Sequence, residues 1–112
     1  MSTDSTCDLS KEMAVVFKAL GDVNRMEIIY LLASGETDWI CVTDLAQQLG
    51  ISQPAVSRHL STLRHAGIVD SQKDGNHIYY TFNRNAMIRY KENIDYLFEC
   101  VVQKCNRLEK EG

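Results

Sequence analysis

Two short predicted helices joined by a glycine constrain the fold of this 112-residue chain more than any other feature. The stretch 43–60 reads TDLAQQLGISQPAVSRHL, and Gly50 separates a helix over roughly 42–49 from a second helix. Ser52 can cap that second helix, and Pro54 can stand in its first turn, where the missing N–H costs little. Its apolar residues recur at helical spacing and should face the core, namely Val56, Leu60 and Leu63. This pattern predicts a helix-turn-helix unit.

A predicted β-hairpin follows the helix pair directly. Residues 68–73 and 77–82 form two strand-like segments, and Asp74-Gly75-Asn76 between them suits a tight reversal. Ser10 and Asp22 can cap two helices upstream, and a long helix should follow the hairpin. These three helices cover about 10–20, 23–34 and 85–110. The predicted fold class is therefore mainly α with a small β-hairpin as its only β structure, a winged helix-turn-helix.

The length of the chain allows one domain and leaves no room for a second. We expect residues 1–8 to form a flexible N-terminal arm and residues 9–112 to form a single winged-helix domain. No stretch approaches the roughly 20 apolar residues of a membrane span, and the polar start lacks the features of a secretory signal. We therefore expect a cytoplasmic protein without a membrane partner. We also expect no enzymatic activity, because phosphate-binding loops, nucleophile elbows and zinc-protease motifs are absent from the sequence.

The overall charge of −3 hides a local excess of cations. Residues 51–84 contain four Lys and Arg against two Asp, so this segment carries +2 and the remainder carries −5. All three histidines lie in the same segment, where solvated or DNA-facing roles are expected for His59, His65 and His77. A basic surface on an acidic body can still bind phosphate. The charge pattern is therefore compatible with nucleic-acid binding.

The outward face of the second helix in the pair carries the predicted base contacts. Gln53, Ser57 and Arg58 should read bases, since Gln can pair with adenine and Arg with guanine. Pro54 shares this face of the helix. The residues expected to position the DNA backbone are Ser61, Thr62, Lys73 and His77. The sequence thus predicts a double-stranded DNA operator as a partner.

The last predicted helix carries one continuous apolar stripe. Its apolar residues follow each other at steps of three and four from Met87 to Leu108. A helix of this length exceeds what so small a domain can cover with its own residues. The surplus predicts a partner helix, most simply from a second copy of the chain.

Three stretches of the sequence resemble the ArsR/SmtB family of winged-helix repressors. They read FKALGDVNR over 17–25, SQPAVSRHL over 52–60 and LRHAGIV over 63–69, and the resemblance covers about Leu9 to Leu108. It implies a homodimer that pairs through its first and last helices and binds a palindromic operator. It also implies a transcriptional repressor that is released from DNA when an inducer binds.

The cysteines suggest what the inducer is. Arsenic-sensing members of the family begin the first helix of the pair with Cys-Val-Cys-Asp-Leu, where this chain has Cys41 followed by Val42 and Thr43. Soft metalloids prefer two or three thiolates, so Cys41 would need Cys7 or a cysteine of the other chain. The Asp and His pairs that zinc-sensing members carry on the last helix are absent, because every histidine precedes Arg84.

Cys100 and Cys105 are the other candidate thiols. They lie about 140° apart around a helix axis, so one chain cannot easily hold a single metal ion with both. Cys105 falls within the apolar stripe and is also compatible with a small buried apolar role. We predict a thiol-reactive inducer, either As(III), another soft metal ion, or a redox or persulfide signal. The alternatives are a DNA-binding regulator without metal sensing and a winged-helix module that binds another protein.

Overall fold

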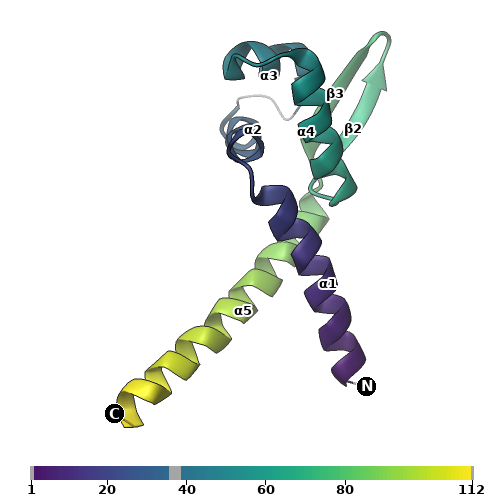
Figure 1. Ribbon diagram of the computed structural model, residues 1–112. Helices are drawn as coiled ribbons and strands as arrows, with labels where there is room; N and C mark the ends of the chain where they lie inside the picture. The colour runs from purple at the N-terminus through teal and green to yellow at the C-terminus, as the bar shows by residue number, and fades with distance from the viewer. Residues whose placement is uncertain (1, 36–38, 112) are drawn as a thin grey trace.

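The computed structural model describes the backbone of residues 2–35 and 39–111 and the side chains of residues 9–35 and 39–109. Its elements are α1 (Ser2–Leu20), α2 (Val23–Ser34), β1 (Ile40–Cys41), α3 (Val42–Leu49), α4 (Gln53–His65), β2 (Val69–Asp74), β3 (His77–Phe82) and α5 (Arg84–Glu111). Figure 1 shows α2, α3, α4 and the β2–β3 hairpin gathered in a head. Helices α1 and α5 run away from this head as two arms that end at the chain termini. The predicted winged helix-turn-helix architecture is confirmed.

An apolar core holds the head together. Ile28 of α2, Leu45 of α3 and Leu60 of α4 are fully buried in it, and so are the predicted inward residues Val56 and Leu63. Full burial of an aliphatic side chain contributes about 1.5–3 kcal/mol. The core therefore fixes α4 firmly against α2 and α3, and this leaves the opposite face of α4 free.

The sheet formed by the described residues has three strands, so the expectation that the hairpin is the only β structure was wrong. The order is β1-β3-β2, and both pairings are antiparallel. Strand β1 consists of Ile40 and Cys41, which lie opposite Tyr80 and Tyr79 of β3. Two residues are too few to show the alternation of apolar and polar side chains that identifies a strand. Their partners also lie far along the chain, where no local pattern can reveal the pairing.

Helix α1 begins before the predicted cap at Ser10. It runs from Ser2 without a break to Leu20. The predicted start of this helix depended on apolar periodicity, which the polar residues before Leu9 lack. Their backbone is nevertheless helical and continuous with the rest of α1. The side chains of residues 1–8 lie outside the described residues, so a flexible arm over this range stays a prediction.

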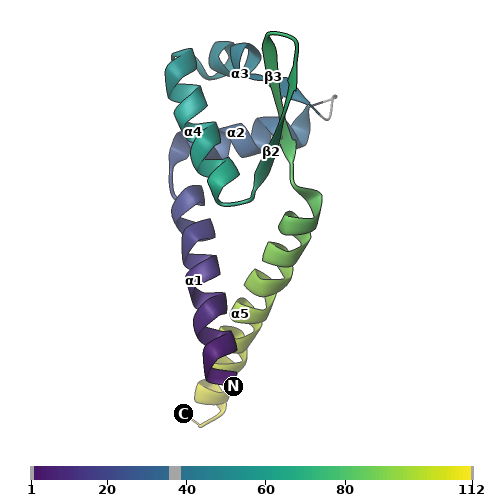
Figure 2. The ribbon, with the colours of Figure 1, turned by 90° about the vertical axis from the view of Figure 1, so that its right-hand side faces the viewer.

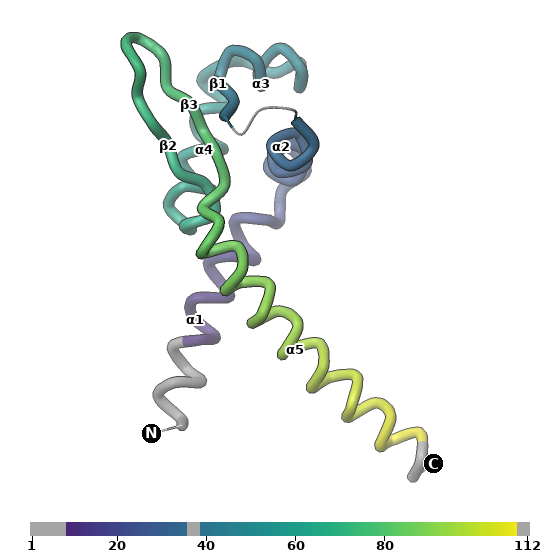
Figure 3. Tube along the Cα trace, turned by 180° about the vertical axis from the view of Figure 1, so that it is seen from behind, coloured from purple at the N-terminus to yellow at the C-terminus, as the bar shows by residue number. Residues whose placement is uncertain are grey.

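The two arms make the molecule less compact than an ordinary domain. The radius of gyration is 17.4 Å and the longest dimension is 60 Å, whereas a compact chain of this length has a radius of gyration of about 13 Å. An ion pair of 3.0 Å between Glu12 and Arg89 joins α1 to α5. Figure 2 shows the tip of the hairpin and the far ends of α1 and α5 at opposite ends of the molecule, and Figure 3 shows α1 and α5 diverging below the head.

Candidate nucleic-acid interface

Helix α4 starts with the local contacts that its sequence predicts. Gly50 adopts a left-handed conformation with φ of 68° and ends α3, and its N–H donates to the Ala46 carbonyl at 2.9 Å. Ser52 then caps α4, because its hydroxyl oxygen accepts the backbone N–H of Ala55 at 3.2 Å. Pro54 stands in the first turn. The start of α4 is therefore set by contacts within a few residues.

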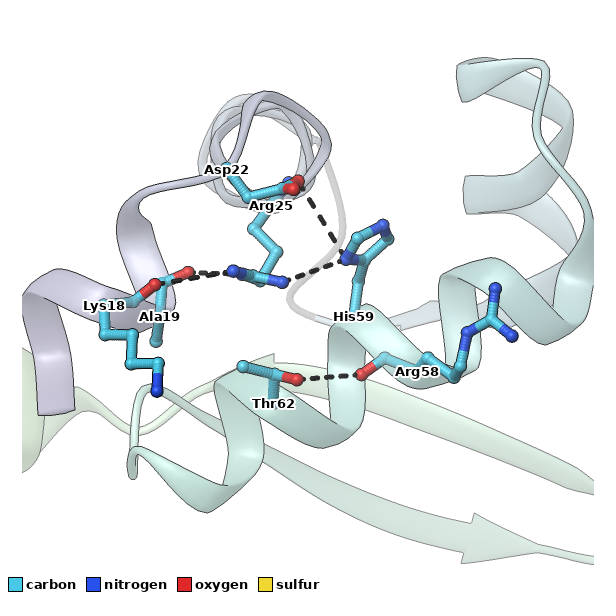
Figure 4. A network of polar contacts seen from close by, with 7 residues as sticks. All are labelled: Lys18, Ala19, Asp22, Arg25, Arg58, His59 and Thr62. Carbon is cyan, nitrogen blue, oxygen red and sulfur yellow. Dashed lines mark hydrogen bonds and ion pairs between the residues drawn. The ribbon is translucent and has the colours of Figure 1, made fainter.

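The free face of α4 is polar and exposed. Gln53, Pro54, Ser57 and Arg58 are all exposed at its N-terminal end, as the helical pattern predicts. In Figure 4 the Arg58 side chain extends away from α2. Among the described residues, no carboxylate lies within ion-pair distance of its guanidinium. This end of α4 thus presents one cation and several hydrogen-bonding groups to an incoming ligand.

The C-terminal half of α4 adds two hydroxyl side chains to the exposed face. Ser61 and Thr62 are both exposed. The Thr62 hydroxyl donates to the Arg58 carbonyl at 3.2 Å, one turn earlier in the helix. These two residues lie on the side of α4 that faces α1.

The hairpin supplies a second exposed element. Gly75 has φ of 63° and reverses the chain between β2 and β3. Asp74 pairs with His77, and Lys73 pairs with Ile78, next to this turn. Lys73 and His77 are both exposed, so the predicted backbone contacts of the wing are accessible at its tip.

His59 does not have the solvated or DNA-facing position that the sequence suggested. Its side chain is only 19% exposed and turns toward α2, where the Arg25 guanidinium donates from Nη1 to His59 Nδ1 at 3.3 Å. A guanidinium is always a donor, so His59 Nδ1 is the acceptor in this contact. Asp22 lies next to the pair, with Oδ1 4.0 Å from His59 Nδ1.

Arg25 is the residue of this region that the sequence analysis missed. Besides the contact to His59, its guanidinium donates to the carbonyls of Lys18 and Ala19 at the end of α1. Asp22 caps α2 by accepting the Arg25 backbone N–H at 3.1 Å. That hydrogen bond, helped by the positive charge of Arg25, holds the pKa of the Asp22 carboxyl below its usual value. Arg25 thus connects α1 and α2 to the helix that carries the exposed polar face.

Comparison with known proteins agrees with this geometry. The sequence model described as "Bacterial regulatory protein, arsR family" matches residues 22–71. The arsenical resistance operon repressor of Staphylococcus xylosus is 34% identical over 85 residues, which cover 76% of this chain and 79% of that relative. The chain belongs to the arsR family.

Two further similarities extend this comparison. The cadmium resistance transcriptional regulatory protein CadC of Listeria innocua serovar 6a is 42% identical over 72 residues, covering 64% of this arsR-family chain and 58% of that relative. The solution structure of the homodimeric winged helix-turn-helix DNA-binding domain Mb0332 from Mycobacterium bovis has a TM-score of 0.68 with 26% identity. The match covers 86% of each chain. These relatives carry the names of regulators.

The cysteines of this arsR-family chain lie in two separate places. Cys41 is half-buried at the start of α3, and its thiol contacts Asp44 Oδ2 at 3.2 Å. Cys100 and Cys105 are exposed on α5, so their own subunit buries neither of them. The side chain of Cys7 lies outside the described residues. Within the described residues, no three Cys, His, Asp or Glu side chains gather closely enough to hold a metal ion.

The described helices also bear on the membrane prediction. None of them combines the length and the hydrophobicity that a bilayer span needs.

Proposed function

We propose that this chain is a transcriptional repressor that binds operator DNA as a homodimer. Helix α4 enters the major groove, and the β2–β3 wing lies against the flanking DNA backbone. The observation that carries the proposal is the exposed polar face of α4. The opposite face of this helix is buried in the core through Val56, Leu60 and Leu63, so the polar face points outward. A rigid helix with one free, cationic and hydrogen-bonding face suits base recognition.

Base recognition is assigned to the N-terminal end of α4. Gln53 is suited to adenine and Arg58 to guanine, because each can form two hydrogen bonds with the major-groove edge of its base. Ser57 lies between them on the exposed face and is short enough for a close contact. Pro54 packs against the DNA without donating a hydrogen bond. The residues assigned to the DNA backbone are Ser61, Thr62, Lys73 and His77.

The homodimer is proposed to form through α1 and α5. Large apolar side chains are exposed along the far half of α5, and Phe98 and Leu108 are each 58% exposed in the single chain. An apolar crevice of about 380 Å³ between α1 and α5 is lined by Phe17, Tyr96 and Leu97 among others. A second copy would bury these groups and supply the compactness that one chain lacks. The homodimeric Mb0332 domain supports this arrangement.

The recognition face is tested with Arg58→Ala and a matched control on the same helix. Arg64 is also exposed on α4 but lies on a different face, so Arg64→Ala removes the same charge elsewhere. Arg58→Ala should weaken binding by about 1–3 kcal/mol per half-site and relax the base preference at one position. Affinities are measured by fluorescence anisotropy on a duplex that the wild-type protein selects from a random library. Unchanged affinity for Arg58→Ala would refute the assigned face.

The wild-type salt dependence separates this function from its main alternative. Phosphate neutralisation releases counterions, so DNA affinity should fall steeply as salt rises. A protein that shows no salt-dependent duplex binding would instead be a winged-helix module for a protein partner.

We further propose that a thiol-reactive inducer releases the repressor from DNA. The similarity to regulators named for arsenical and cadmium resistance supports a soft-metal inducer. A reducing cytoplasm would keep Cys7, Cys41, Cys100 and Cys105 as thiols. The described part of one subunit does not supply three metal ligands, so As(III) or another soft metal ion would need thiolates from Cys7 or from both subunits. The exposed Cys100 and Cys105 are also accessible to a redox or persulfide signal.

Serine variants test the inducer. DNA release by arsenite, cadmium and a persulfide donor is compared for wild type, Cys41→Ser, Cys100→Ser, Cys105→Ser and a variant in which all four cysteines are serine. The all-serine variant should bind DNA normally and fail to respond. If it responds as wild type does, thiol sensing is wrong and the protein is a regulator with another inducer or none.

A further inference from the structure

A crevice of about 580 Å³ separates α1 from α4 and has an unusual lining for so acidic a chain. Two permanent cations and a histidine face it, namely Lys18, Arg25 and His65. Ser61 and Thr62 form part of the opposite wall. None of the described residues that line the crevice is acidic. Cations together with hydroxyl donors are the groups that bind a phosphate.

Arg25 and Lys18 have different roles in this crevice. Arg25 is held in place, because it donates to the Lys18 and Ala19 carbonyls and to His59. The Lys18 ammonium is not engaged in this way: the side chain is exposed, and no carboxylate of the described residues lies within ion-pair distance of it. Figure 4 shows the Lys18 side chain reaching from α1 along the side of α4 that carries Thr62. Lys18 is therefore the exposed cation of the crevice that is available to a ligand.

The crevice opens beside the proposed recognition face. Ser61 lies one turn after Ser57, and Thr62 lies one turn after Arg58, so all four side chains follow one side of α4. A duplex that lies along Ser57 and Arg58 passes the mouth of the crevice, where its backbone comes next to Ser61 and Thr62.

We propose that this crevice binds a phosphate of the DNA backbone and that Lys18 is a DNA contact outside both the helix-turn-helix and the wing. The inference rests on the proposed function, since it extends the same interface onto α1. Lys18 supplies the charge, Ser61 supplies a hydroxyl donor, and the anchored Arg25 keeps the wall positive. The Thr62 hydroxyl already donates to the Arg58 carbonyl and forms part of the wall. Each repressor dimer places two such sites on its operator, one in each half-site.

The salt dependence of operator binding tests the proposal. The variants are Lys18→Gln, the charge-preserving Lys18→Arg, and Lys11→Gln as the matched control. Lys11 lies on the same face of α1 two turns farther from α4, about 10 Å away, is exposed, and does not line the crevice. The probe is a duplex selected by the wild-type protein, and anisotropy is recorded from 50 to 300 mM NaCl.

Removing Lys18 should lower both the affinity and the slope of log K against log [salt]. One phosphate contact contributes about 0.9 to that slope, so Lys18→Gln in both subunits should reduce it by about 1.8. At 0.1 M salt this corresponds to a loss of roughly 60-fold in affinity. Lys18→Arg should keep most of the wild-type slope, and Lys11→Gln should keep all of it.

Four results would overturn the proposal. If Lys18→Gln keeps the wild-type slope, Lys18 contacts no phosphate and the proposal fails. Duplex binding by the wild-type protein would still support the proposed function. Equal losses in Lys11→Gln and Lys18→Gln would show a general effect of net charge. If Lys18→Gln abolishes binding of inorganic phosphate to the free protein but leaves duplex binding unchanged, the crevice is a site for a small anion. Absence of wild-type duplex binding would refute the proposed function and this inference together.

Discussion

The contact between Arg25 and His59 ties the proposed recognition helix to α2, and a double-mutant cycle can measure what it contributes to folding. The perturbation on one side is His59→Leu, which keeps a side chain of similar size and removes the acceptor. On the other side Arg25→Met keeps the apolar stem and removes the guanidinium. The two single variants and the double variant complete the cycle with wild type.

The expected magnitude follows from the geometry. A hydrogen bond to a charged group contributes about 1.5–3 kcal/mol. The distance from Arg25 Nη1 to His59 Nδ1 is 3.3 Å, and the His59 side chain is 19% exposed. Both facts weaken the contact, so we expect a coupling free energy of about 1–1.5 kcal/mol. Arg25→Met alone should cost more than His59→Leu, because it also frees the Lys18 and Ala19 carbonyls at the end of α1.

The assay is equilibrium unfolding in urea, followed by far-UV circular dichroism. All variants are measured at one protomer concentration, because association with a second copy would stabilise the folded state. His59→Asn should recover most of the loss, since its amide oxygen can take the place of Nδ1. His59→Gln places its amide one bond farther out and should recover less. If the losses in unfolding free energy of the two single variants add up to that of the double variant within about 0.3–0.5 kcal/mol, the contact contributes no coupling free energy and the reasoning is refuted.

The same variants link this contact to DNA binding. His59→Leu should weaken operator binding, because α4 is held less firmly against α2. The salt slope should stay at the wild-type value, since no cation is removed from the proposed interface. A reduced slope in His59→Leu would instead mean that His59 itself contacts the DNA backbone.

Three further predictions concern capping, assembly and pH. Ser52→Ala removes the side-chain cap of α4 and should lower the free energy of unfolding by about 1 kcal/mol; an unchanged urea midpoint would contradict this. Val101→Asp places a charge on the exposed apolar face of α5 and should yield monomers in sedimentation, whereas Asn106→Asp, at a polar position of the same helix, should not. The pKa of Asp22 lies below its usual value because the Arg25 N–H stabilises the carboxylate, so Asp22 contributes stability above its unfolded pKa that is lost as pH falls through the folded value. Thermal melts should therefore show wild type losing stability relative to Asp22→Asn below about pH 4. The same pH dependence of the melting temperature in both proteins would contradict this prediction.

The sequence by itself determined the local structure of the head. Asp22 and Ser52 cap their helices as predicted, and the predicted bounds of α2, α3 and β3 agree with the structure. Each of these signals depends on contacts within about four residues, such as a side-chain cap or a glycine with positive φ. The helical spacing of Val56, Leu60 and Leu63 also identified the buried face of α4, and with it the exposed one.

The tertiary structure alone decided which distant residues meet. Strand β1 exists because Ile40 and Cys41 pair with Tyr80 and Tyr79 of β3. His59 turns inward because it contacts Arg25, which lies on α2. Lys18 joins the crevice beside α4 for the same reason. A helical pattern tells which side of one helix faces inward, but it does not tell which neighbour covers that side or its edges. Such contacts depend on how the helices pack through a core shared by segments far apart in the chain.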